Sequence, residues 1–169
     1  INETLECWEI ALKSENTPSA IALSRQKVAY INPTSSRENK CEKGAYTINI
    51  TSHESNVTLI ASGTEVELAL KVQQKLKENN IHSKVVSMPC MELFDRQPED
   101  YRKNILEEDS FIITLEAGSI MSWQKYTRNK GFNLGIDKFG ESAPYKDVYN
   151  HFKLSEESIT NFIQKKLRE

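Results

Sequence analysis

Residues 57–70, with the sequence VTLIASGTEVELAL, decide the fold of this chain. The run from Val57 to Ala61 is rich in β-forming residues and has no polar alternation after Thr58. Such a run is typical of a strand that is buried on both faces, as the strands of parallel sheets are. Gly63 interrupts the run, and apolar residues then return at helical spacing up to Leu76. This stretch therefore predicts a strand, a tight turn and a helix, which form the first half of a βαβ unit.

The turn inside this stretch carries a candidate helix cap. Ser62 and Glu65 fit the capping box, in which the hydroxyl and the carboxylate each accept a backbone amide proton. Free amides at a helix start can instead hold an anion. We favour the cap, because the Glu65 carboxylate satisfies an amide and repels phosphate. Glycine-rich nucleotide-binding signatures do not occur in the sequence.

The elements around this unit predict an α/β fold. Residues 84–87 and 111–115 are expected to be buried strands, and 133–136 a weak one. Residues 46–50 alternate in polarity and are expected to pair with 57–61 as a hairpin, at an antiparallel edge. We expect helices over residues 66–76, 98–106, 120–126 (with Ser119 as its cap) and 145–152, and from Ser155 to the end, with 91–97 irregular. This order predicts a three-layer α/β/α domain around a mixed, mostly parallel sheet of about five strands.

Two helix faces follow from the spacing of apolar residues. In the last helix, an inward face is expected, made of Ile159, Phe162, Ile163 and Leu167. Near the start, residues 3–13 place Leu5, Trp8 and Leu12 on one face, with Asn2 as a candidate cap.

The segment before residue 44 differs from the rest. Residues 19–23 are almost wholly apolar and predict a short strand. One helix and one strand cannot form a core, so residues 1–26 are expected to complete a domain whose body lies elsewhere. Residues 34–43 are polar and aperiodic, which predicts a linker that proteases cut first, between Pro33 and Lys43.

Composition excludes several classes of protein. The chain of 169 residues has 22 basic and 24 acidic side chains and a formal net charge of -2. This balance argues against nucleic acid or an anionic membrane as a partner. No apolar run approaches the ~20 residues of a membrane span. Cys7, Cys41 and Cys90 are odd in number and far apart, so a disulfide framework is not expected and a reducing compartment is. The start at Ile1 favours a piece of a longer polypeptide.

Few side chains outside the turn are candidates for a metal-binding, catalytic or ligand-binding site. His53, His82 and His151 are isolated, so we interpret them as surface residues. Cys90 follows a predicted strand, where a nucleophile can lie, but a small buried thiol is the better interpretation because no partner base is evident. The turn 116–118 ends another predicted strand, where open α/β sheets often bind ligands, although an ordinary turn fits as well.

Arg25 is the sharpest single candidate. It follows the predicted strand 19–23 and lies between Ser24 and Gln26. A guanidinium at a strand end can bind a phosphate through two parallel hydrogen bonds. A surface salt bridge explains the same residue, and spacing by itself favours that interpretation.

Several short motifs, taken in order, resemble those of transketolases. They are LSRQ (23–26), ASGTEVELA (61–69), VVSMP (85–89), FD (94–95), YR (101–102), EAG (116–118) and FGESAP (139–144). The resemblance covers nearly the whole chain and implies the C-terminal portion of such an enzyme. It implies that residues 1–30 end the pyrimidine-binding domain, 31–43 are a linker and 44–169 are the C-terminal domain.

The resemblance also implies a function. Transketolases use thiamine diphosphate and a divalent metal, usually Mg²⁺, to move a two-carbon ketol unit from a ketose phosphate to an aldose phosphate in the pentose phosphate pathway. They are cytoplasmic homodimers with active sites between subunits. Arg25 matches the family's arginine that binds the sugar phosphate. The catalytic, cofactor-binding and metal-binding residues of the family lie upstream, so none is expected here, and this chain by itself is expected to be inactive.

Two other readings remain. Another thiamine-dependent enzyme, of the dihydroxyacetone synthase or deoxyxylulose-phosphate synthase type, shares the chemistry. A non-catalytic binding or oligomerisation module can share the fold. The SRQ and FGESAP stretches together favour transketolase. The sequence departs from the resemblance at residues 91–93 and over 34–43, neither of which concerns a catalytic position.

Overall fold

The computed structural model describes residues 1–31, 38–52, 55–107, 109–127 and 131–169. Within them, one sheet has the strand order β1-β3-β2-β4-β5. Its strands are β1 (Tyr46–Ile50), β2 (Val57–Ala61), β3 (Ser83–Ser87), β4 (Phe111–Leu115) and β5 (Phe132–Leu134). The pairs β3–β2, β2–β4 and β4–β5 are parallel, and β1 joins β3 antiparallel. The predicted mixed, mostly parallel sheet is thus confirmed.

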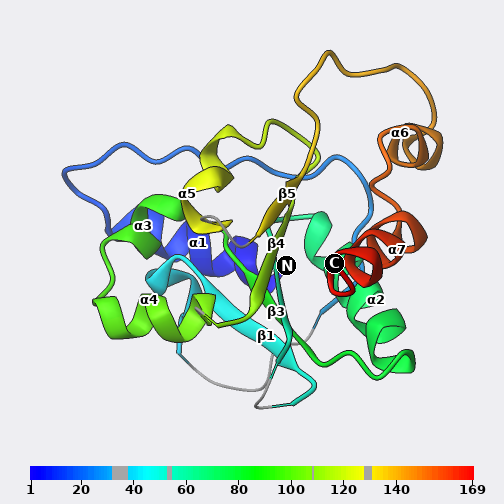
Figure 1. The fold of residues 1–169 in the computed structure, drawn as a ribbon. Coiled ribbons are helices and arrows are strands. Elements are labelled where there is room, and N and C mark those ends of the chain that lie inside the picture. Colours follow the sequence, from blue (N-terminus) through cyan, green and yellow to red (C-terminus); the bar gives the residue numbers. More distant parts are fainter. Residues whose placement is uncertain (32–37, 53–54, 108, 128–130) are drawn as a thin grey trace.

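Helices cover both faces of this sheet (Figure 1). They are α1 (Asn2–Lys13), η1 (Lys40–Lys43), α2 (Glu65–Glu78), α3 (Met91–Asp95), α4 (Glu99–Leu106), η2 (Met121–Trp123), α5 (Gln124–Thr127), α6 (Tyr145–His151) and α7 (Glu156–Lys166). Figure 1 shows α2 and α7 together on one side of the sheet, and α3, α4 and α5 on the other. The fold is the expected three-layer α/β/α arrangement.

The central strand β2 explains why the sheet is covered on both sides. Its five residues are all buried. Leu59 contributes to a core cluster that includes Ile163 of α7, whereas Ile60 contributes to a second cluster with Phe94 of α3. Side chains that alternate along one strand thus serve two cores, so an uninterrupted apolar run is what this strand requires.

The predicted hairpin between residues 46–50 and 57–61 is wrong. β1 pairs with β3, and Tyr46 lies opposite Ser87. The reason is that β3 and β4 already occupy both edges of β2, which leaves no edge for β1. The prediction of an antiparallel strand at the sheet edge is confirmed with this different partner.

The segment 91–97, expected to be irregular, contains the helix α3. Five residues are too few for a helical period to be visible in the sequence. The helix expected over 120–126 divides into η2 and α5, without a side-chain cap, although the Ser119 hydroxyl accepts the Met121 amide at 3.3 Å.

Leu167, expected to face inward, lies just past α7 and is 39% exposed. The predicted cap of α7 is confirmed, because the Ser155 hydroxyl accepts the amide of Ser158.

The strand predicted over residues 19–23 is also wrong, because this segment is neither helix nor strand. A strand needs a partner, and none of the described sheet edges receives this one. Asn2 does not cap α1 either. It is the first residue of the helix, and its side-chain amide points to the Tyr30 hydroxyl at 3.5 Å.

Polar contacts attach α1 to the rest of the domain. The Glu3 carboxylate accepts from the hydroxyls of Tyr46 (2.9 Å) and Ser87, and the Glu6 carboxylate accepts the Cys41 amide at 3.1 Å. Three apolar residues of this helix, and Ile1 before it, face outward and are each at least half exposed, namely Ile1, Leu5, Trp8 and Leu12. Hydrogen bonds to buried partners therefore hold α1, and its apolar face has no cover from the described residues.

Candidate functional site

The strand order places a crevice where open α/β sheets commonly bind ligands. The chain leaves β2 toward β3 on one side, and later returns to place β4 on the other side. The carboxyl ends of β2 and β4 therefore lie next to each other at the point where the strand order reverses. Ser62 follows β2 and Glu116 follows β4, so the fold brings together two turns that the sequence separates.

The predicted capping box in the first turn is wrong. Thr64 precedes α2 as its N-cap, and its side chain makes no capping hydrogen bond. The Glu65 amide binds the backbone carbonyl of Ser62 at 3.1 Å, so it has no need of a hydroxyl. The Ser62 hydroxyl instead donates to the Glu116 carboxylate at 3.4 Å. The tight turn supplies its own backbone acceptor and releases both side chains for contacts across the crevice.

Two carboxylates occupy the crevice. Glu65 is buried and accepts from the hydroxyls of Thr64 (2.7 Å) and Tyr149 (2.5 Å). Glu116 accepts from the indole nitrogen of Trp123 at 3.2 Å, in addition to Ser62. Trp123 is buried, so the crevice is filled by side chains of η2 and α6.

The electrostatics of this crevice disfavour an anion. Burial, and then the charge of Glu65, raise the pKa of Glu116 above its usual range. Burial and the hydrogen bond to Glu65 raise the pKa of Tyr149. The site favours hydrogen-bond donors and protons over phosphate. The repulsion of phosphate by Glu65, expected from the sequence, is joined here by the second carboxylate, Glu116.

The structure places Arg25, the predicted phosphate-binding residue, at the surface. It lies in a bend of an exposed segment that has no helix or strand. Within the described residues, its guanidinium makes no hydrogen bond or ion pair. The segment is anchored four residues later, where the Ala29 amide donates to the Glu67 carboxylate at 3.1 Å. No described contact joins Arg25 to the crevice, so its role in phosphate binding stays a prediction.

The histidines form no site in the described part of the chain. His82 and His151 are exposed, and His53 lies outside the described residues. Among the described residues, no three metal-ligating side chains gather in one place. The described helices also include none that is long and apolar enough to cross a membrane.

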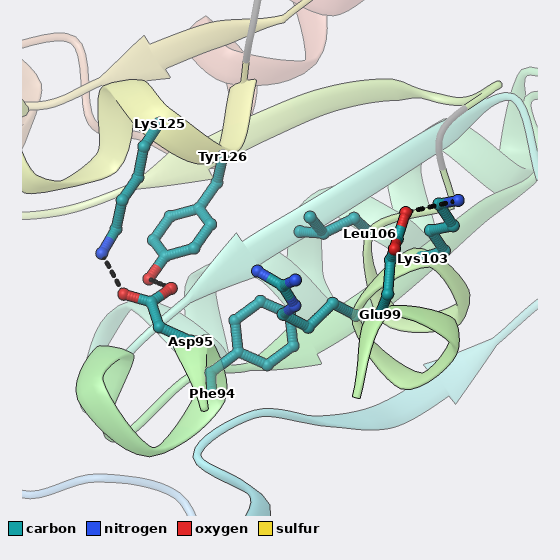
Figure 2. A pocket seen from close by; sticks show the side chains of 8 residues that line it. Phe94, Asp95, Glu99, Lys103, Leu106, Lys125 and Tyr126 are labelled. Carbon is teal, nitrogen blue, oxygen red and sulfur yellow. Dashed lines mark hydrogen bonds and ion pairs between the residues drawn. The ribbon is translucent and has the colours of Figure 1, made fainter. Parts of the chain in front are cut away.

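A cavity of about 230 Å³ lies between α3, α4 and α5 (Figure 2). Asp95 is its central acceptor, since it receives hydrogen bonds from Lys125 and from the Tyr126 hydroxyl, the latter at 2.9 Å. Glu99 and Lys103 form an ion pair on the opposite wall at 2.7 Å. The carboxylates of this cavity therefore already have cationic partners.

Arg102 also lines this cavity. Its Nε atom is buried and has no hydrogen-bond partner within the described residues. A buried donor without a partner is uncommon in folded proteins. The sequence pointed to Arg102 only through the YR motif, because the residues that surround it come from three helices.

The cysteines are arranged in a way that the sequence did not suggest. Cys90 is half-buried, its thiol donates to Glu92 at 3.5 Å, and burial raises its pKa. Cys7 and Cys41, which are distant in the sequence, come close together, since the Cys41 sulfur lies 3.9 Å from the Glu3 carbonyl oxygen and each thiol influences the pKa of the other. Sequence spacing offers no signal for this contact, because it depends on how α1 docks.

Comparison with known proteins decides the family. Residues 44–155 match the family model described as the transketolase-like TK C-terminal domain. This chain belongs to that family. The resemblance to transketolases that the sequence motifs indicated is thereby confirmed.

Relatives of this transketolase family member extend the match beyond the domain. A transketolase of Sinorhizobium medicae is 39% identical over 160 residues, which are 94% of this chain and 23% of that relative. A transketolase of Bacillus subtilis is 39% identical over 166 residues, 96% of this chain and 25% of that relative. The chain thus spans about a quarter of the length of the curated relatives it matches.

Solved transketolases have the same fold. A Campylobacter jejuni transketolase superposes with a TM-score of 0.86 at 36% identity, over 96% of this chain and 24% of that one. A Pichia stipitis transketolase in complex with sedoheptulose 7-phosphate superposes with a TM-score of 0.89 at 29% identity, over 99% of this chain and 24% of that one. The extended segment around Arg25 is included in these matches, since nearly the whole chain is covered.

Proposed function

We propose that this chain acts as the C-terminal part of a transketolase. The complete protein would transfer a two-carbon ketol unit from a ketose phosphate to an aldose phosphate, in the pentose phosphate pathway. One observation carries the proposal: three transketolases match 93–98% of this chain at 37–41% identity. The Pichia stipitis relative has been solved with xylulose 5-phosphate and with sedoheptulose 7-phosphate, which supports sugar phosphates as substrates.

Within this proposal, Arg25 binds the phosphate of the sugar. Its guanidinium can donate two parallel hydrogen bonds to phosphate oxygens, and it is exposed and unpaired within the described residues. The bond between Ala29 and Glu67 anchors the segment to α2, which limits how far Arg25 can move. The Arg25 guanidinium is thus available to bind the phosphate of a sugar that arrives from solution.

The proposed cofactors, thiamine diphosphate and Mg²⁺, are not assigned to this chain. Its described residues offer no cluster of three metal-ligating side chains, and the crevice at the ends of β2 and β4 disfavours a diphosphate. We propose, from the family resemblance, that other parts of the protein hold both groups and supply the catalytic residues. In consequence, this chain is proposed to be inactive by itself.

The remaining parts of the proposal concern assembly. We propose that residues 1–30 end the pyrimidine-binding domain, that 31–43 connect it to the C-terminal domain, and that 44–169 form that domain. The exposed apolar face of α1 suits contact with the rest of the chain. We also propose that the complete protein is a homodimer in the cytoplasm. The near-neutral charge of this chain argues against nucleic acid or an anionic membrane as a partner.

The test is two-carbon transfer by the complete protein, with and without Arg25→Ala. Losing a charge-assisted contact of about 1.5–3 kcal/mol should lower kcat/KM roughly tenfold to a hundredfold for phosphorylated acceptors. Activity with unphosphorylated acceptors should be unchanged. Arg25→Lys should recover part of the loss, because it keeps the charge and not the bidentate geometry. Arg96→Ala, at another exposed arginine, is the matched control and should behave as wild type.

Each outcome separates the alternatives. Full activity of Arg25→Ala would leave the transketolase proposal intact but would contradict phosphate binding by Arg25. Transfer that prefers formaldehyde as acceptor, or a decarboxylating condensation of pyruvate, would favour the dihydroxyacetone synthase or deoxyxylulose-phosphate synthase alternative. Complete absence of thiamine-dependent transfer in the wild type would favour a non-catalytic binding or oligomerisation module.

A further inference from the structure

Two cysteine thiols meet where α1 docks on η1. Cys41 is 1% exposed, and its sulfur lies 3.9 Å from the backbone carbonyl oxygen of Glu3. In an α-helix, the carbonyl of residue 3 accepts the amide of residue 7, so this oxygen lies one turn away beside Cys7. The Cys41 thiol therefore lies against the turn that carries Cys7, close enough for each thiol to influence the pKa of the other.

Backbone contacts hold both cysteines in this arrangement. The Cys41 amide donates to the Glu6 carboxylate at 3.1 Å, and the Asn39 side chain donates to the Glu6 carbonyl oxygen at 3.0 Å. The Glu3 carboxylate binds Tyr46 on the other side. The residue that precedes Cys7 and the residues around Cys41 are thus fixed to each other, which keeps the two sulfurs close.

The environments of the two thiols differ. Cys7 is partly exposed, whereas Cys41 is buried. A hydrogen bond from Cys41 lowers the pKa of Cys7, although burial and the charges of Glu3 and Glu6 oppose this effect. The same hydrogen bond, together with burial, raises the pKa of Cys41. Cys7 is thus the accessible sulfur that more readily becomes a thiolate, and Cys41 is a thiol held beside it.

We propose that Cys7 and Cys41 are a redox-reactive pair that closes an intramolecular disulfide in the presence of hydrogen peroxide. The Cys7 thiolate attacks the peroxide, the O–O bond breaks, and the products are a Cys7 sulfenic acid and water. The Cys41 sulfur then attacks the Cys7 sulfur and displaces the hydroxyl as a second water. Two thiols are oxidised and one peroxide is reduced to two waters.

The disulfide would change one part of the molecule. It would attach α1 covalently to η1 and close a ring over residues 8–40, which contains Arg25. The polar contacts that now hold α1 can open and close, whereas the covalent bond cannot. The proposal does not depend on ketol transfer, since its chemistry involves only the two cysteines and the peroxide.

The test uses the complete protein, purified with its thiols reduced and then treated with hydrogen peroxide. After alkylation of remaining thiols, tryptic peptides are mapped without reduction. The expected product is the peptide that ends at Lys13 joined to Cys41–Lys43, with Cys90 alkylated. The oxidised protein should also unfold at a higher temperature than the reduced one, and reduction should abolish the difference.

Variants separate the two roles without relying on stability. In Cys41→Ser, dimedone should trap a sulfenic acid on Cys7. In Cys7→Ser, Cys41 should remain unmodified because it is buried. Cys90→Ser is the matched control and should crosslink like wild type. A wild type that shows no Cys7–Cys41 crosslink, or in which Cys90 is oxidised before Cys7, would overturn the proposal.

Discussion

At the scale of single residues, the environment of Glu116 disfavours the charge of its carboxylate. Its carboxylate lies at the end of β4, receives hydrogen bonds from Ser62 and Trp123, and is close enough to Glu65 to feel its charge. Burial and that like charge raise the pKa of Glu116. The folded state therefore binds the Glu116 proton more tightly than the unfolded state does.

This pKa shift predicts a pH dependence of stability. The stabilisation by the Glu116 proton is complete below the unfolded pKa of about 4.3 and is lost as pH rises through the higher folded pKa. Glu116→Gln keeps an oxygen acceptor for Trp123 and never ionises. The variant should therefore gain stability relative to wild type as pH rises from 4 to 8, measured by urea unfolding. Glu78→Gln, at an exposed site, should show no such trend. A difference that is constant with pH would contradict the assignment.

At the scale of elements, α7 shows how one helix divides between core and surface. Ile159 and Ile163 are fully buried in the cluster that includes α2 and β2. The charges at the two ends agree with the helix dipole, with Glu156 and Glu157 in the first turn and lysines in the last. The helix is thus held by its apolar face and by favourable end charges, and Leu167 beyond it adds little.

Truncation at two positions of this helix should differ in cost. Ile163→Ala removes buried methyl groups next to α2 and should lower the free energy of unfolding by about 2–5 kcal/mol. Leu167→Ala, at the exposed end, should cost less than about 1 kcal/mol. Chemical denaturation of both variants measures these costs. Equal losses would mean that Leu167 is buried in solution, as its helical spacing suggested.

At the scale of the whole molecule, the α/β/α domain is preceded by an N-terminal segment whose two parts differ in how they are attached. The first part, α1, is attached through Glu3 and Glu6. The second part, residues 22–30, is exposed and has neither helix nor strand. Because Lys40–Lys43 is helical and Cys41 is buried, protection from proteases is expected to begin earlier than the linker prediction implied.

Limited proteolysis of this 169-residue chain tests that division. Trypsin should cut first at Arg25 or Lys27, because these sites are exposed and without secondary structure. Cuts at Lys40 or Lys43 should follow later. Mass spectrometry over a time course identifies the order. Early cuts within Val57–Leu76, which includes β2 and most of α2, would contradict the domain core described here.

The sequence by itself determined several of the local elements and the family. The apolar run of β2, the break at Gly63 and the helical spacing after it are properties of neighbouring residues, so the strand, the turn and α2 were predictable. The same holds for the Ser155 cap, whose hydroxyl binds an amide three residues away. The motif order likewise predicted the transketolase family, which the family model confirms.

Only the tertiary structure decided which elements meet. β1 pairs with β3 because β2 has no free edge, and the segment 19–23 forms no strand because no edge receives it. Glu116 meets Ser62 across the crevice, and Cys7 meets Cys41 where α1 docks. These contacts join residues that are far apart in the chain, and their energies depend on burial and on partners from other elements. The periodicity of a sequence reflects only residues that are close together in the chain, so it does not predict these long-range contacts.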